Sequence, residues 1–130
     1  MSDPQDYAPR PDTSTTRGLP VIISTTFEIP GMRVTTYLGS CFGVVVRSMG
    51  FAKGIGAAFK SLAGGEVRQY TELLEDSRRH AIDRMVANAQ VLGANAVVGM
   101  RFDSSEIGQS LTEIVAYGTA VIAEPAGPAS

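Results

Sequence analysis

The side chains that could bind a soft metal ion are few in this sequence. Such ions prefer several cysteine or histidine ligands at short spacing. The chain contains one cysteine, Cys41, one histidine, His80, and five methionines, with no Cys-x-x-Cys or His-x-x-x-His motif. A single copy therefore does not supply a soft-metal site, whereas a symmetric oligomer could bring several Cys41 thiols together. The alternative, which we favour for both residues, is structural: Cys41 lies in the core or an interface, and His80 is solvated or in an interface.

Carboxylates form a second group of candidates. Asp103, Glu106 and Glu113 surround a polar segment that is typical of a hairpin connection. Two of them could form an acid–base pair only if one were buried beside the other. Oxygen ligands in such a turn could also bind a hard cation, for which Asp103 and Glu106 are the candidates. The alternative is that all three are solvated turn residues, which is the commoner role of acids in a hairpin.

The sequence gives little support for covalent catalysis or nucleotide binding. Ser24-Thr25-Thr26 has no evident base partner, and no Gly-x-x-x-x-Gly-Lys-Ser/Thr phosphate loop is present. Gly65 does lie just before a predicted helix, and helix N-termini attract anions. Arg68 and Arg78 could assist Gly65 in such an anion site. We therefore predict no catalytic residue and no enzyme activity.

A long helix is the element that must position these candidates. From Val67 to Leu92 the apolar and small residues recur at steps of one, three and four, which is the helical period. Gly93 is suited to the left-handed conformation that ends a helix. The helix would be roughly 39 Å long at about 1.5 Å per residue, so part of it is expected to project toward a neighbouring subunit. The stripe consists of Val67, Tyr70, Leu73, Leu74, Ser77, Ala81, Ile82, Met85, Val86, Ala89 and Leu92.

Four segments have the composition or the alternation of β-strands. They are 21–26, 32–47, 96–102 and 112–123. In the second of these, alternation places Cys41 on the more polar face, and Gly39 and Gly43 are expected to mark a bulge, a bend or a close approach of another backbone. In the third, alternation places four residues on one core-like face, namely Ala96, Val98, Met100 and Phe102.

A second, shorter helix is predicted at 51–63, separated from the long helix by Gly64-Gly65. The element order is then β-β-α-α-β-β, which predicts an α+β fold of two layers with an antiparallel sheet. Four short strands leave exposed sheet edges, and exposed edges invite association unless they are covered or paired. Together with the long helix, these edges predict a homo-oligomer.

Length and composition narrow the class of protein. A length of 130 residues predicts a single domain. The net charge is −2, and the sequence lacks the basic patch expected of a nucleic-acid binder. The N-terminus has no signal-peptide pattern, and no apolar run is long enough to span a membrane, so a cytoplasmic protein is expected. We predict a disordered arm at 1–19, a domain at 20–124 and a tail at 125–130.

The sequence resembles the YbjQ-like proteins of bacteria and archaea, which are also labelled heavy-metal-binding domains. The match covers roughly residues 21–123, and its most specific part is the segment Leu92-Gly93-Ala94-Asn95-Ala96-Val97-Val98-Gly99. The other matching pieces are Ser24-Thr25-Thr26 with Gly31, Tyr37-Leu38-Gly39, Gly64-Gly65 with Tyr70, Leu74, Arg78 and Ala81, the flanks of the segment from Ala89 to Asp103, and Tyr117-Gly118-Thr119-Ala120-Val121.

The resemblance implies a small fold, similar to a dodecin subunit, that assembles into a pentameric ring. It implies little about activity. We predict a non-catalytic homo-oligomeric ring that acts as a binding or scaffold module, with no cofactor beyond a divalent or soft metal. The alternative is a heavy-metal-binding protein whose sites are completed between subunits. One position departs from the family pattern. Relatives often carry a cysteine in the tyrosine-x-glycine segment, where this chain has Leu38. A metal role tied to that thiol therefore does not transfer to Leu38.

Overall fold

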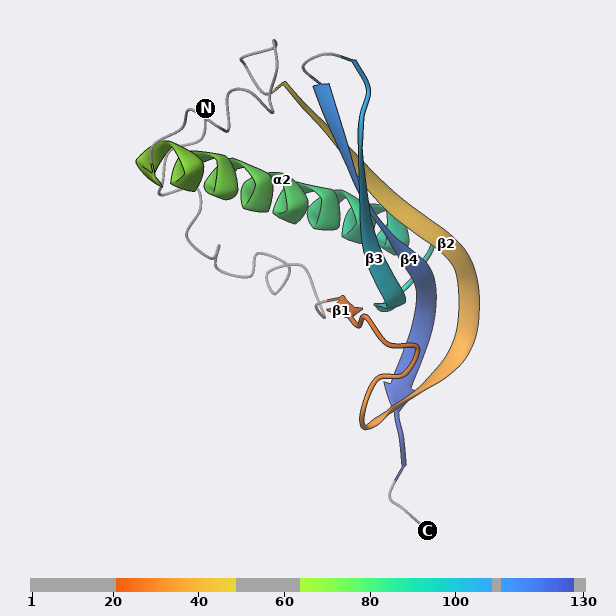
Figure 1. Ribbon diagram of the computed structural model, residues 1–130. Coiled ribbons are helices and arrows are strands. Elements are labelled where there is room, and N and C mark those ends of the chain that lie inside the picture. Colours follow the sequence, from red (N-terminus) through yellow and green to blue (C-terminus); the bar gives the residue numbers. More distant parts are fainter. Residues whose placement is uncertain (1–20, 49–63, 109–110, 128–130) are drawn as a thin grey trace.

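The fold is α+β, with one helix and four strands in the residues that the structure describes (Figure 1). The structure is a computed structural model and describes residues 21–48, 64–108 and 111–127. The elements are β1 (Ile22–Ile23), β2 (Met32–Ser48), α2 (Gly64–Val91), β3 (Ala96–Glu106) and β4 (Leu111–Pro125). The predicted arm at 1–19, the predicted helix at 51–63 and the end of the tail lie outside those ranges. No described segment has the length and hydropathy of a bilayer-spanning helix.

The sheet is mixed, with the strand order β1-β3-β4-β2. β4 pairs antiparallel with both β2 and β3, as predicted, but β1 pairs parallel with β3. The expectation of a fully antiparallel sheet is therefore wrong. The reason is that β1 and β2 do not form a hairpin. The chain leaves β1 on one edge of the sheet and returns as β2 on the opposite edge, so β1 pairs with the start of β3 instead.

Helix α2 extends three residues further toward the N-terminus than predicted and ends one residue earlier. Gly93 has a φ of 91°, and its N–H donates to Gln90 O at 2.9 Å. This is the left-handed helix end for which glycine is suited. The predicted stripe is the packed face, because Ala81, Met85 and Ala89 are completely buried against the sheet.

Two glycines in β2 have the roles that the sequence left open. At Gly39, which has a φ of 119°, the pairing with β4 shifts register, as expected of a bulge. At Gly43 the helix backbone comes close: a Cβ there would lie 2.3 Å from both Ala81 O and Met85 N. The absence of a side chain at Gly43 therefore allows α2 to lie directly on β2.

A bulge in β3 changes the faces of that strand. The pairing of β3 with β4 shifts between Val98 and Arg101, and Gly99 has a φ of 64°. Ala96 and Val98 consequently lie on the face away from α2, whereas Met100 joins the core on the helix side. The prediction that these residues share one face with Met100 is wrong, because a bulge inserts one residue into the alternation.

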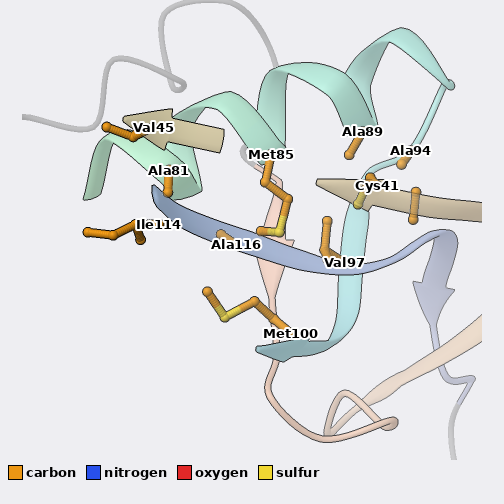
Figure 2. Close-up of a cluster of buried hydrophobic side chains, with 11 residues drawn as sticks. Cys41, Val45, Ala81, Met85, Ala89, Ala94, Val97, Met100, Ile114 and Ala116 are labelled. Atoms are coloured by element: carbon orange, nitrogen blue, oxygen red, sulfur yellow. The ribbon is translucent and has the colours of Figure 1, made fainter. Parts of the chain in front are cut away.

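The sheet has a core on each face. The larger core lies between α2 and the sheet, where Met85 is surrounded by small residues from the strands (Figure 2). The smaller core lies on the opposite face, where Ile29, Met32 and Val34 pack over the buried residues Ala96, Val98, Val121 and Ala123. Among the described residues, this packing covers only part of the second face, and Phe42 and Tyr117 on the same face are exposed.

The close approach at Gly43 predicts a large effect of a side chain there. Gly43→Val is expected to lower the free energy of unfolding by about 2–3 kcal/mol, because the helix must move away from the strand. Urea unfolding measures the change. Gly127→Ala is the matched control, since a Cβ there meets nothing within 4 Å and the φ is ordinary. Equal stability of the two variants would contradict the packing described here.

Candidate functional site

A depression on the described surface lies between β2 and α2. It has a volume of about 660 Å³ and is open to solvent. We call it the edge groove, and it is lined by Val44, Val45, Val46 and Arg47 of β2 and by His80, Asp83 and Arg84 of α2. Because β2 is the last strand of the sheet, one wall of the groove is an open strand edge. The other wall is the charged flank of the helix.

A polar network connects β2 to α2 beside the edge groove. Arg47 Nε donates to Ser77 Oγ at 3.1 Å, and Ser77 Oγ donates to Leu73 O at 2.8 Å. The guanidinium of Arg47 lies 3.7 Å from the carboxylate of Asp76, which is only 3% exposed. A terminal nitrogen of Arg47 also contacts Nδ1 of His80. Arg47 thus joins the open strand to three residues of one helical turn.

The network fixes the hydrogen-bonding role of His80. An arginine nitrogen can only donate, so Nδ1 of His80 must accept and its proton lies on Nε2. Nε2 in turn lies 3.8 Å from Asp76 Oδ1, one helical turn earlier. The arrangement satisfies the buried polar groups of the described residues, because none of their buried side-chain nitrogens or oxygens lacks a hydrogen-bond partner. The network therefore anchors the helix to the strand.

The structure places Cys41 in the main core. The residue is 3% exposed, and its Sγ lies 3.7 Å from Gly118 O. The prediction that Cys41 lies on a polar face is wrong, because the bulge at Gly39 lets both Leu38 and Cys41 contact the helix-side core. Burial raises the pKa of the Cys41 thiol through desolvation, which disfavours the thiolate that binds metals.

The carboxylate candidates do not converge. Asp103 and Glu106 are exposed and lie three residues apart on β3, so they point to opposite faces of the sheet. Glu113 pairs with Ser105, whose hydroxyl lies 3.4 Å from its carboxylate. Among the described residues no three His, Cys, Asp or Glu side chains form a group that could hold a metal ion. A heavy metal therefore finds no donor set within this part of one chain.

The proposed anion-site residues are also separate. Gly65 lies inside the first turn of α2, and the prediction that it comes just before the helix is wrong, because α2 already begins at Gly64. Arg68 is exposed. Arg78 lies ten residues after Arg68, or about 15 Å along the helix. Its guanidinium lies 4.9 Å from the ring centroid of Phe102, in a cation–π contact with β3. The structure thus brings Arg78 to the sheet and not to the helix N-terminus.

Sequence reasoning did not identify Arg47, Asp76 and Ser77 as members of one polar network. Ser77 was assigned to the packed stripe, where it is indeed fully buried. The spacing of Asp76 and His80, four residues apart on a helix, was a signal that could have indicated their pairing. Arg47 could not be linked to them from the sequence, because its partners are about thirty residues away along the chain.

The described residues form a small α+β fold with a mixed sheet, a helix packed on it and a groove at the sheet edge. The chain belongs to the family whose model is named YbjQ and described as "Putative heavy-metal-binding", which matches residues 21–124. It is similar to a UPF0145 protein of Bradyrhizobium, with 56% identity over 82% of this chain and 96% of that protein. It is also 50% identical to a UPF0145 protein of the archaeon Methanoregula boonei, over 81% of this chain and 88% of the relative.

A solved structure shares the fold. It is the crystal structure of a protein of unknown function from Pediococcus pentosaceus, assigned to the DUF74 family. The TM-score is 0.54 at 13% identity, and the match covers 80% of this chain and 98% of that one. The family model and the relatives confirm the family resemblance inferred from the residues. The shared fold of the solved structure agrees with the α+β class.

The Arg47 network predicts a stabilising role for Asp76. Asp76→Ala is expected to lower the free energy of unfolding by about 2–3 kcal/mol, less than for a fully buried pair because Arg47 and His80 are partly exposed. The matched control is Glu124→Ala, which removes an exposed ion pair with Arg33 and should cost less than about 1 kcal/mol. Thermal or urea unfolding distinguishes the two. A loss as small as that of the control would show that the network adds nothing.

The position of Cys41 predicts slow thiol chemistry. In the folded protein, Cys41 is expected to react with an aromatic disulfide reagent at least about 100-fold more slowly than in the unfolded chain, because the thiol is buried and protonated. Absorbance of the released thiolate measures the rate. The control is Ser40→Cys in a Cys41→Ser background, which places a thiol at the exposed neighbouring position. Similar rates for the two folded proteins would contradict the core position.

Proposed function

We propose that this chain assembles into a closed homo-oligomeric ring and acts as a non-catalytic binding or scaffold module. The supporting observation is that the described sheet has two open edges made by different strands. β2 pairs only with β4, and β3 has β1 beside it only at Ala96 and Val97. A contact between unlike edges is heterologous, and a heterologous contact that closes on itself forms a ring. The family resemblance favours five subunits.

Two further features support association. Open strand edges of this length invite pairing with another chain, and β2 runs over seventeen residues. On the sheet face away from α2, the described residues also expose large apolar side chains. They include Phe42, Tyr117 and Val46, which are 56%, 42% and 49% exposed. Phe42 and Tyr117 are cross-strand partners. A subunit or a partner protein that covered this face would bury them.

The non-catalytic character of the proposal is supported by the edge groove itself. Of its polar residues, Arg47 and His80 belong to the Arg47 network, and the groove offers no pairing of a nucleophile with an aligned base. The proposed role of the protein is to bind a ligand or partner on the faces of the assembled ring. The proposal includes no nucleic acid and no membrane, and it names no other partner protein.

Heavy-metal binding is the alternative, and the family description is the observation that favours it. The described part of one chain lacks a group of three ligands, so such a site would have to be completed between subunits. Cys41 is poorly placed for this role, since its thiol is enclosed between α2 and the sheet. Exposed Asp103 and Glu106 remain available for a shared site at a subunit contact.

Native mass spectrometry before and after chelation tests both readings. We expect one ring mass, near five times the subunit mass of 13.7 kDa, that chelation leaves unchanged. A ring that carries stoichiometric metal, or that dissociates when the metal is removed, would establish the alternative. A monomer at micromolar concentration would refute the ring. If the ring carries metal, the double variant Glu106→Gln with Asp103→Asn shows whether the metal is bound by the hairpin acids.

A further inference from the structure

We infer that the edge groove is a docking site for β3 of a second copy of this chain, with Glu106 of that copy paired to Arg84. The inference rests on the proposed function, because it names the contact by which the ring would form. It starts from the stretch of β2 that is open. The side-chain amide of Asn88 donates to Phe42 O at 2.6 Å, so the helix itself occupies the edge at that point. Beyond it, Val44 to Arg47 face the groove.

The opposite edge of the sheet is open over a matching stretch. The first residues of β3 are covered: Gly99 N donates to Thr26 O and Met100 N donates to Ser24 O. Arg101 then extends this cover, because its guanidinium donates to Thr25 O at 2.7 Å. From Phe102 to Glu106, β4 is the only neighbouring strand of β3 in the described sheet. The covered and open parts of β3 are therefore set by the segment that follows β1.

The directions of the two open stretches are compatible. β2 and β3 both run antiparallel to β4, so they run in the same direction as each other. A second copy placed beside β2 in the same orientation would continue the sheet by a parallel pairing. The rows of the sheet also agree: Arg47 and Glu106 both pair with Thr112, so they lie at the same level on the same face. That face carries α2, because Ile114, two residues along from Thr112, belongs to the helix-side core.

The charges of the two surfaces are complementary. Arg84 lines the groove, and neither it nor Glu106 forms an ion pair within the described residues. Arg47 is already bound to Asp76, and Asp83, the acid of the groove, is already engaged in an interaction. Arg84 is therefore the cation available to an incoming acid. Glu106 of the second copy points to the helix side and enters the groove, whereas Asp103 points to the other face.

A charge exchange tests this contact in the full chain. Arg84→Glu and Glu106→Arg should each raise the protein concentration at which the ring dissociates by about tenfold or more, because each variant places like charges together. The double variant restores opposite charges and should return that concentration to within about threefold of the parent value. The matched control is Asp103→Arg, which makes the same change on the opposite face of the same strand and should leave assembly within about threefold. Native mass spectrometry over a dilution series gives all the values.

The outcomes separate the inference from the proposed function. Rescue by the double variant, together with an unaffected control, would support the contact. A parent ring that survives both single variants, or a loss that the double variant fails to rescue, would overturn the contact and leave the ring intact as a proposal. A parent protein that is monomeric throughout the dilution series would overturn both.

Discussion

The contact of α2 with β2 at Gly43 is the constraint on which the rest of the structure depends. With no side chain at that position, the helix backbone lies directly on the strand, within the distance that a Cβ would occupy. The surrounding core is built to the same scale, since Ala81, Ala89, Ala116 and Ala120 are all fully buried in it. Met85 is the large side chain that fills the space they leave. A core of this kind fixes the helix position tightly, because small residues leave little freedom for it to slide.

The position of the helix in turn defines the surface beside it. α2 lies against β2 at Gly43, and beyond that point β2 has β4 as its only partner strand in the described sheet. Asn88 caps the edge at Phe42, and the network of Arg47 with Asp76 and His80 closes the groove further along. The groove is thus a by-product of close packing. Two side-chain contacts limit it, and both depend on the helix remaining in place.

Much of this fold could be predicted from local patterns. The helix, its end at Gly93, the three longer strands and the packed stripe follow from periodicity and from glycine chemistry. Face assignments failed where bulges intervene, because a single extra residue at Gly39 or Gly99 reverses the alternation. Parallel pairing of β1 was not predictable either, since two residues carry too little pattern to choose a partner. The Arg47 network depends on a contact between segments that are distant in the sequence. Only the pairing of Asp76 with His80 could be expected from the sequence, because the two residues are four positions apart on a helix.

The enclosure of Cys41 has a consequence for the chemistry of the whole molecule. Oxidation to a sulfenic acid, or to a mixed disulfide, requires a thiolate that the oxidant can reach. The chain has no other cysteine, and this one is sealed between a helix and a sheet in its protonated form. The Cys41 thiol is therefore protected from oxidation while the chain stays folded. While the chain stays folded, Cys41 is not available for a disulfide between copies, so an assembly of folded chains would not depend on one.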